Sequence, residues 1–434
     1  MEHILSQARN IADDAEVFTV SSEETPVQFE ANRLKHIQSK QSHTVALRII
    51  REGRIGYGVS TNPEDIQGLI DMAVTTAEFG MPAVFELPSL TAYPQVDTYD
   101  SAVMSVSLEE MVKLGEKLIA TVREHTPDIV CEAEVTKKTI SVSIINSRKG
   151  QADYTKSIFN LGISGTLVSE NDMLFVGEGE SRCHPVLETK TITDTVINHL
   201  NWAKNQASLP SQSLPVIFTP NGVASTLMAP LMAAFNGKLV LEGASPIASK
   251  LGEQIFSQDL WLSDDTTIPY HPRSRPCDDE GVASRRTPLI EAGTIANFLY
   301  DLRTASLAGT ESTGNGSRHG GGLPNPSPGT FIIQAANTTF GDMISNMKKG
   351  LIIEYLMGAS QGNILGGDFS GNVLLGYKVE NGRIVGRVKD TMVSGNVYQV
   401  LKDITAIGND AKWVGDFLNT PSLYCPSLSV VSKG

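Results

Sequence analysis

The chain has 434 residues, of which 41% are hydrophobic and 19% are charged. A single hydrophobic core seldom grows past roughly 250–300 residues, so this length predicts two or three domains. The composition excludes a disordered or collagen-like protein, because those classes lack the apolar residues of a packed core. With 35 Lys and Arg against 48 Asp and Glu, the net charge is −13. An acidic surface repels phosphate backbones, so we expect no nucleic-acid partner.

The cysteine pattern and the N-terminus indicate the compartment. Cys131, Cys183, Cys277 and Cys425 lie far apart without a C-x-x-C pair, which indicates neither a disulfide framework nor a zinc knuckle. The N-terminus lacks the basic and apolar regions of a secretory signal, and no apolar run approaches 18 residues. We therefore expect a cytoplasmic protein with no membrane partner.

Helical and alternating periodicities in the first 80 residues predict a small α+β unit. The expected elements are a helix over 3–12, strands over 15–20, 26–30, 43–52 and 54–60, and a helix that begins at Asn62-Pro63 and ends at Gly80. The two last strands are joined by the turn-forming Glu52-Gly53 and should make a hairpin. This unit predicts an N-terminal domain over residues 1–82 with a small antiparallel sheet.

The next region predicts a helix followed by antiparallel strands. A proline-rich connector covers residues 81–103, and Ser107 with Glu110 forms a capping box that should begin a helix. From residue 128 to residue 179 the apolar residues alternate with polar ones, as in Ile140, Val142 and Ile144. We expect an antiparallel meander and a middle domain over residues 83–207.

The last part of the chain predicts a large β-rich domain over residues 208–434. The Ser- and Pro-rich segment 208–215 is typical of a linker, and a buried strand over 215–219 follows it. A helix over 221–236 should be kinked by Pro230. Short strands follow, with further helical segments near 297–307 and 340–349. The predicted fold class is α+β.

The spacing of the eight histidines argues against a zinc peptidase helix in this chain. No two histidines lie four or five residues apart and none precedes a glutamate, whereas such a helix needs two ligands one turn apart beside a glutamate.

The sequence also gives no sign of a catalytic nucleophile. No G-x-S-x-G elbow occurs. Neighbours in a strand point to opposite faces, so Cys183 and His184 form no nucleophilic pair. Carboxylates beside Cys277 raise the pKa of its thiol and oppose thiolate chemistry.

Two segments leave alternatives open. The carboxylates of Asp264-Asp265 and Asp278-Asp279-Glu280 would suit a hard cation or a cationic peptide, or they shape turns with one carboxylate paired to Arg285 or Arg286. The Gly-rich segment 309–329 would cradle an anion, lie against an extended peptide, or form a mobile loop. Its prolines and glycine spacing exclude a dinucleotide fingerprint.

Three blocks of the sequence resemble the TldD/PmbA family, once called modulators of DNA gyrase. The first, 278–318, contains the family's acidic turn, E-x-G hairpin, Y-D-x-x-T-A helix and S-T-G-N-x-x-R loop. These pieces are Asp278 to Gly281, Glu291-Ala292-Gly293, Tyr300-Asp301 with Thr304-Ala305, and Ser312-Thr313-Gly314-Asn315 with Arg318. The segment 366–396 resembles a later G-D-F-S block, and 44–62 resembles the strand and hairpin of the first domain.

The resemblance implies one subunit of a heterodimeric metallopeptidase that acts on unfolded peptides. In that family the TldD subunit carries zinc on an H-E-x-x-x-H helix aided by a C-terminal cysteine, and the TldE/PmbA subunit lacks these ligands. The corresponding helix here, 221–236, contains neither His nor Glu, and Cys425 then has no histidines to join. The resemblance therefore implies the TldE/PmbA-like branch, with no catalytic or metal residue in this chain and with zinc in a TldD-like partner.

The resemblance also marks candidate site residues. The candidates for peptide contact are Ser312, Thr313, Gly314, Asn315 and Arg318, and those for shaping a pocket are Asp278, Glu280 and Arg303. The alternative function is a stand-alone homodimeric peptide-binding protein, or a hydrolase with an unrecognised site.

Overall fold

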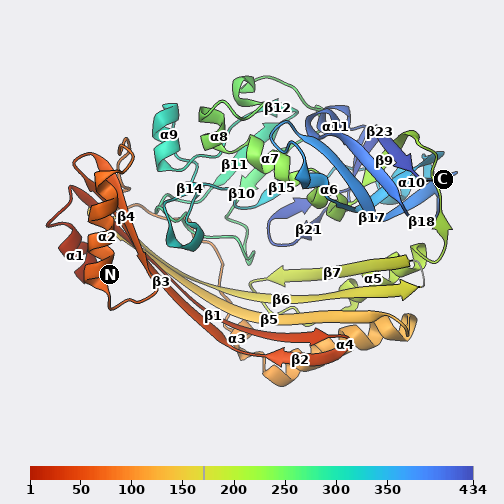
Figure 1. Cartoon of the computed structure of the whole chain (residues 1–434), viewed down its shortest axis with the longest axis horizontal. Coiled ribbons are helices and arrows are strands. Elements are labelled where there is room, and N and C mark those ends of the chain that lie inside the picture. Colours follow the sequence, from red (N-terminus) through yellow and green to blue (C-terminus); the bar gives the residue numbers. More distant parts are fainter. Residues whose placement is uncertain (170–171, 434) are drawn as a thin grey trace.

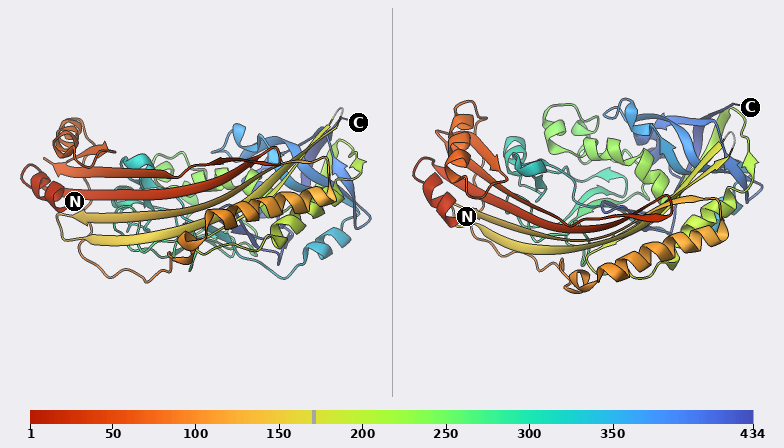
Figure 2. Two further views of the ribbon diagram at one scale, coloured as in Figure 1. Left: turned by 90° about the horizontal axis from the view of Figure 1, so that it is seen from below. Right: turned by 60° about the horizontal axis from the view of Figure 1, so that its bottom comes forward.

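A long curved sheet carries the first half of the chain, and the second half packs on its concave side (Figure 1). The computed structural model describes residues 1–169 and 172–433. The two termini lie toward opposite ends of the long axis, and helices cover the convex side of the sheet (Figure 2). The architecture confirms the predicted α+β class.

The curved sheet is entirely antiparallel, with strand order β4-β3-β1-β5-β6-β7 and β2 paired to one end of β1. Its strands are β1 (Asp14–Glu30), β2 (Arg33–Ile37), β3 (Lys40–Arg51), β4 (Arg54–Ser60), β5 (Val130–Asn146), β6 (Gln151–Ser169) and β7 (Asp172–Arg182). The hairpin turn between β3 and β4 has positive φ at Glu52 and Gly53, as the sequence predicts.

The expectation of two separate sheets in residues 1–82 and 83–207 is wrong. The central strand β1 pairs with β3 on one side and β5 on the other, so that Val17 lies opposite both Leu47 and Ile145. Local periodicity identifies each strand, but the partner of a strand more than a hundred residues away leaves no local signal. The boundary at residue 82 therefore does not separate two sheets.

Helices pack on the sheet at both of its ends. They are α1 (Glu2–Ala8), α2 (Ile66–Glu78), α3 (Ala102–Ser105), α4 (Leu108–His125) and α5 (Lys190–Trp202). The capping box of α4 is confirmed, since Ser107 Oγ accepts the Glu110 N–H at 3.2 Å and Glu110 accepts the Ser107 N–H at 2.8 Å. Helix α2 begins later than predicted, because Asp65 and not Asn62 caps it by accepting the Gly68 N–H.

The second half of the chain forms two further sheets. One has the order β16-β9-β23-β19-β17-β18-β8, with β20 on β23, and an extra pairing of β16 with β17 closes part of it into a ring. Its strands are β8 (Gln206–Ala207), β9 (Gln212–Phe218), β16 (Lys349–Met357), β17 (Asp368–Glu380), β18 (Arg383–Val388), β19 (Thr391–Asn396), β20 (Ala406–Ile407) and β23 (Leu423–Ser432).

The other sheet has the order β12-β11-β10-β15-β22-β21, and β13 pairs with β14 beside it. These strands are β10 (Leu262–Asp265), β11 (Arg286–Glu291), β12 (Thr294–Ile295), β13 (Gly316–Ser317), β14 (Asn325–Pro326), β15 (Phe331–Ile333), β21 (Lys412–Val414) and β22 (Leu418–Thr420). The helical segments of this half are α6 (Pro220–Thr226), α7 (Met228–Ala234), α8 (Gly237–Leu241), η1 (Ala248–Lys250), α9 (Leu302–Ala308), η2 (His319–Gly321), α10 (Phe340–Ser345), η3 (Ala359–Gln361) and α11 (Val397–Asp403).

Two local predictions for this half need correction. The expected linker 208–215 is part of the fold, because Leu209 and Leu214 are buried and β9 begins at Gln212 between β23 and β16. The helices near 297–307 and 340–349 are shorter than predicted. Helix α9 begins only after Asp301, whose carboxylate accepts the Thr304 N–H at 2.7 Å as an N-cap.

The predicted kink at Pro230 is a break between two helices. Helix α6 ends at Thr226 and α7 begins at Met228. Proline has no N–H to donate to the carbonyl four residues earlier, so the helical ladder is interrupted one turn before Pro230. Thr219 caps α6 by accepting the Gly222 N–H at 3.2 Å.

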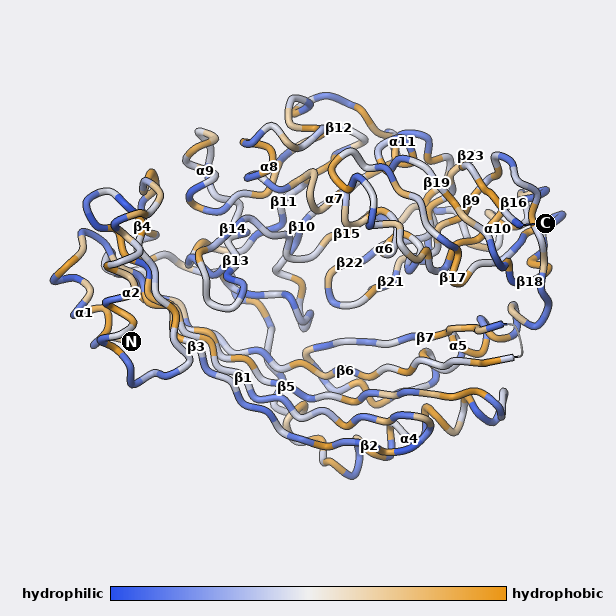
Figure 3. The backbone as a smooth tube through the Cα atoms, viewed as in Figure 1, coloured by the Kyte–Doolittle hydropathy of each residue, from blue (hydrophilic) through white to orange (hydrophobic). Residues whose placement is uncertain are grey.

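Hydrophobic residues are spread along the strands in short stretches separated by hydrophilic ones (Figure 3). This pattern follows from strands that bury one face and expose the other. Among the described helices, none combines the length and apolar content needed to cross a bilayer.

Gly115 fixes how closely α4 approaches the sheet. A Cβ at this position would lie 2.2 Å from the ring of Phe29, which is buried in β1. Changing Gly115→Ala should therefore lower the free energy of unfolding by about 1–3 kcal/mol through overpacking, even though alanine favours a helix. Urea denaturation measures this change. The neighbouring exposed Glu116→Ala is the control and should have little effect; a stabilised G115A protein would contradict this packing.

Candidate functional site

Four buried charged side chains join the curved sheet to the second half of the chain. Arg48 on β3 places Nη1 2.6 Å from Glu280 Oε1 and Nη2 3.0 Å from Glu16 Oε2 on β1. Arg318 also pairs with Glu16. We call Glu16, Arg48, Glu280 and Arg318 the ionic clasp. Each of these residues is less than 10% exposed, so water screens their attraction poorly.

The acidic turn that precedes Glu280 is held by its own carboxylate. Asp278 accepts the N–H groups of Glu280 (3.0 Å), Val282 (2.9 Å) and Gly316 (2.8 Å), which ties the turn to β13. Burial raises the pKa of Asp278, while Arg275 and these N–H donors oppose the rise. Burial also raises the pKa of Glu280, against the opposing effect of the Arg48 guanidinium. Asp278 therefore works as a turn-forming residue.

The loop that carries the S-T-G-N-x-x-R pattern, residues 312–318, is anchored in the same way. Asn315 Nδ2 donates to Asp264 Oδ2 at 2.7 Å, and Thr313 Oγ1 accepts the Tyr300 N–H at 2.8 Å. Ser312 Oγ donates to the Tyr300 carbonyl at 3.1 Å. Gly314 has φ +76°, a left-handed conformation that favours glycine. These contacts fix the loop against β10 and against the segment that precedes α9.

The structure thus gathers the predicted site residues into a buried cluster. Ser312, Thr313, Asn315 and Arg318 are all less than 10% exposed, and none of them lines the large cavity described below. Arg303 is partly buried on α9, and its Nε has no hydrogen-bond partner among the described residues. Contact of these residues with a peptide stays a prediction. Their visible interactions hold the fold together.

The two interpretations of the carboxylates can be compared with the contacts. Turn formation by Asp278 agrees with the structure, but the cationic partner of Glu280 is Arg48 rather than Arg285 or Arg286. Arg285 donates to the Ser312 carbonyl, and Arg286 Nε donates to Ser263 Oγ at 3.2 Å. The described residues contain no group of three or more His, Cys, Asp or Glu side chains arranged to hold a metal ion.

The described cysteine thiols are buried and unsuited to nucleophilic chemistry. Burial, together with Asp278, raises the pKa of the Cys277 thiol to about 12, and burial raises that of Cys183 to about 11. This direction agrees with the prediction made from the carboxylates beside Cys277. The larger cause is desolvation, which the sequence alone does not give.

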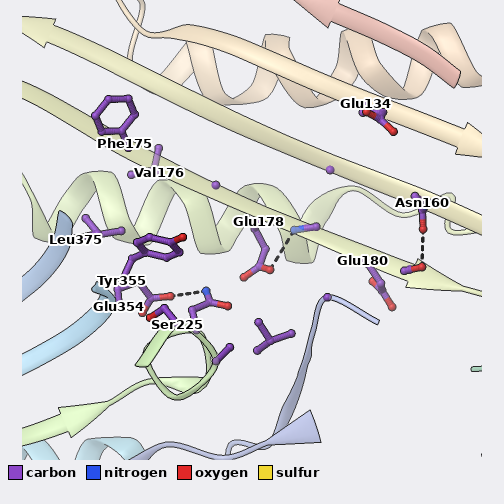
Figure 4. Close-up of a pocket in the computed structure, with 18 of the residues that line it drawn as sticks. Glu134, Asn160, Phe175, Val176, Glu178, Glu180, Ser225, Glu354, Tyr355 and Leu375 are labelled. Carbon is purple, nitrogen blue, oxygen red and sulfur yellow. Dashed lines mark hydrogen bonds between the residues drawn. The ribbon is translucent and has the colours of Figure 1, made fainter. Parts of the chain in front are cut away.

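A cavity of about 720 Å³ lies between the curved sheet and the second half of the chain (Figure 4). We call it the cleft. One wall comes from β5, β6 and β7, and the other from α6, β16, β17, the end of β21 and the segment between β21 and β22. Its lining residues are Glu134, Asn160, Leu161, Gly162, Phe175, Val176, Gly177, Glu178, Gly179, Glu180, Ser181, Asn221, Ala224, Ser225, Glu354, Tyr355, Leu374, Leu375, Val414, Gly415 and Phe417.

The cleft has a free strand edge along one wall. Strand β7 is an edge strand of the curved sheet, and among the described strands it pairs only with β6. The N–H of Gly179 donates to the carboxylate of Glu178 at 3.1 Å, so a side chain occupies this position of the edge. Gly177 and Gly179 flank Glu178 and carry no Cβ, which lets another backbone approach closely. The edge is suited to the addition of an extended chain.

The opposite wall carries a buried carboxylate. Glu354 on β16 is 4% exposed and accepts a hydrogen bond from Asn221 Nδ2 on α6 at 2.6 Å. His199 Nε2 on α5 lies 3.6 Å from the same oxygen. Burial lowers the pKa of His199, although Glu354 opposes this, so the imidazole is neutral near pH 7. The sequence analysis named one element of this wall, the helix over 221–236, but missed Glu354 and His199, because they come from distant segments and form no motif.

Two models of known protein domains match parts of this chain. A model of the "PmbA/TldA metallopeptidase C-terminal domain" matches residues 211–432, which is more than half of the chain, and a model of "PmbA/TldA metallopeptidase domain 1" matches residues 15–77. The chain belongs to the PmbA/TldD family. This membership confirms the family that the three sequence blocks indicate.

Curated relatives share this family over different lengths. An uncharacterized protein of Methanocaldococcus jannaschii is 27% identical, with 100% of this chain and 99% of the relative covered. The metalloprotease PmbA of Escherichia coli O157:H7 is 33% identical over 52% of this chain and 47% of its own length.

Solved structures share the fold across the whole chain. TldE from Thermococcus kodakarensis superposes with a TM-score of 0.91 at 23% identity, covering 100% of both chains. A putative modulator of DNA gyrase from Thermotoga maritima gives 0.90 at 21% identity, covering 99% of both. At these identities the likeness establishes the fold.

The ionic clasp should dominate the stability of this family member. Changing Arg48→Met leaves Glu280 buried without its guanidinium and removes one of the two partners of Glu16. We expect the free energy of unfolding to fall by about 3–5 kcal/mol in urea denaturation, because an unpaired buried charge is costly. The double variant R48M/E280Q should recover part of the loss, since it removes the charge left unpaired on Glu280.

The control for this change is the exposed pair of Lys113 and Glu109 on α4, joined at 2.6 Å. Lys113→Met should change the free energy of unfolding by less than about 1 kcal/mol, because water screens an exposed pair. If R48M behaved like K113M, the clasp would have no special role.

Proposed function

We propose that this chain is the TldE/PmbA-like, zinc-free subunit of a cytoplasmic peptidase that acts on unfolded peptides. It pairs with a TldD-like zinc subunit and holds the substrate. The observation that carries the proposal is the composition of helix α6, which lies in the segment that the family resemblance matches to the zinc-binding helix of the TldD branch. This helix lines the cleft with Asn221, Ala224 and Ser225.

The residues of α6 do not fit a zinc ion. Zinc in proteins is held by His, Cys, Asp or Glu, and α6 and α7 contain none of them. The carboxylate of Glu354 on β16 contacts α6, but its Oε1 already accepts a hydrogen bond from Asn221. We therefore assign this chain the binding of peptide and the completion of a chamber, and assign hydrolysis to the partner. The four free cysteines are compatible with a reducing cytoplasm.

Strand addition is the binding mode that the cleft supports best. An extended peptide laid along β7 would form main-chain hydrogen bonds in place of the Glu178 contact with Gly179. Main-chain pairing does not depend on side chains, so this mode accepts many unfolded sequences and excludes folded ones. The cavity is roomy enough for a short extended segment.

Co-purification tests the subunit assignment. The chain mixed with a TldD-like zinc subunit should elute as one complex in size-exclusion chromatography with light scattering, and that complex should cleave unfolded peptides. The chain alone should bind less than stoichiometric zinc by elemental analysis and should be inactive.

Two results would contradict this assignment. Zinc-dependent cleavage by the chain alone would establish a hydrolase with an unrecognised site. A stable homodimer that binds peptides but ignores every TldD-like subunit would establish a stand-alone binding protein.

Backbone methylation tests strand addition without altering the protein. Hexapeptides N-methylated at alternate positions lose the N–H groups that point to one side of a strand. One methylation register should abolish binding in isothermal titration calorimetry, and the other should leave it nearly unchanged, because only one side of the peptide pairs with β7. If both methylation registers weakened binding equally, the peptide would not pair with β7 through its main chain.

A further inference from the structure

Glu354 is a buried carboxylate in the wall of an open cleft. It is 4% exposed, and its backbone lies in β16 beside α6 (Figure 4). A carboxylate that loses its hydration is stable only when hydrogen bonds or a positive charge replace the water. The partners of Glu354 therefore decide what its free side can bind.

The recorded partners of Glu354 are neutral. The Asn221 amide donates to Oε1, and His199, which is neutral near pH 7, lies 3.6 Å from the same oxygen. In the described part of the chain, no hydrogen bond reaches Oε2 and no Lys or Arg pairs with this carboxylate. The charge of Glu354 is thus left without a cation.

The other carboxylates of the cleft differ in this respect. Glu178 pairs with Lys412 at 2.7 Å, and Glu180 pairs with Arg182 at 2.9 Å. Glu134 is exposed and accepts hydrogen bonds from Thr136 and Gln28. Each of these charges is neutralised by a cation or hydrated by water. Glu354 alone combines deep burial with a missing counter-charge among the described carboxylates of the cleft.

The surroundings of Glu354 suit a long cationic side chain. Tyr355, the next residue of β16, and Phe175 on β7 both line the cleft and are partly exposed. Aromatic faces attract ammonium and guanidinium groups and pack against their methylene stems. Aromatic side chains from both walls therefore line the same cleft as the carboxylate of Glu354.

We propose that Glu354 binds a positively charged group of the extended peptide, either a Lys or Arg side chain or the peptide's own α-ammonium. The inference rests on the proposed function, since it assumes a peptide along β7. It adds a preference for certain peptides. Main-chain pairing with β7 accepts any unfolded sequence, and Glu354 favours the sequences that place a positive charge near its carboxylate. The bound cation supplies the counter-charge that Glu354 lacks in the free chain.

A peptide series on the wild-type chain tests this preference. The probes are acetylated and amidated hexapeptides of Ser, Thr and Val with one Lys at each of the six positions in turn, and the same peptides with norleucine, which keeps the stem and removes the charge. A norleucine peptide with a free amino terminus separates the α-ammonium from the side chain. Isothermal titration calorimetry should give about tenfold tighter binding for a cation at one or two positions.

The Glu354→Gln variant keeps the oxygen that accepts from Asn221 and removes the charge. Its affinity for the cationic peptide should fall to that of the norleucine peptide, and its affinity for the norleucine peptide should not fall. Glu180→Gln is the matched control, because that carboxylate already has Arg182, and it should keep most of the preference. Thermal melting of each variant verifies folding, and if E354Q failed to fold, the wild-type series would decide the matter.

The outcomes separate the two proposals. Equal binding of lysine and norleucine peptides, or an unchanged preference in E354Q, overturns the role of Glu354 and leaves strand addition standing. Binding of no peptide overturns both. A preference confined to the free amino terminus would identify the α-ammonium as the group bound, and a preference confined to lysine would identify the side chain.

Discussion

The ionic clasp is the constraint on which the rest of the molecule depends. Arg48 reaches from β3 to Glu280 in the acidic turn, and Glu16 on β1 is shared by Arg48 and Arg318. Two residues of the sheet and two of the second half meet with balanced charge. Burying four charges is costly unless every one is paired, so the geometry of this contact is strictly defined. The clasp fixes one end of the curved sheet against the second half.

The other end of the sheet also contacts the second half, since Arg387 of β18 pairs with Asp172 at the start of β7, and the cleft lies along the part of β7 that follows. Strand β7 keeps a free edge there, next to α6 and β16. Free edges invite unwanted pairing, and here the contact of Glu178 with Gly179 and the salt bridge of Glu178 with Lys412 partly cover the edge. Buried paired charges therefore hold one part of the sheet, and a strand edge without a strand partner among the described strands lines the cleft.

Sequence reasoning found two residues of the clasp, Glu280 and Arg318, but gave them another role. Asp278, Glu280, Asn315 and Arg318 stand out because acidic turns and Gly-rich loops are typical of binding sites as well as of tight structural turns. Arg48 gave no signal, since one arginine in a strand is ordinary. Glu354 was missed for the same reason, since it belongs to no motif and matters only through its burial and position.

The sequence by itself determined the hairpin of β3 and β4, the start of α4, the α+β class, the family, and the absence of an H-E-x-x-x-H motif. These follow from local periodicity, capping residues and motif spacing, which act over a few residues. Only the tertiary structure decided that β1 joins β3 and β5 in one sheet, that segment 208–215 is part of the fold, and that a carboxylate faces the cleft without a cation. Those facts depend on contacts between residues more than a hundred positions apart, and on desolvation, which no local pattern records.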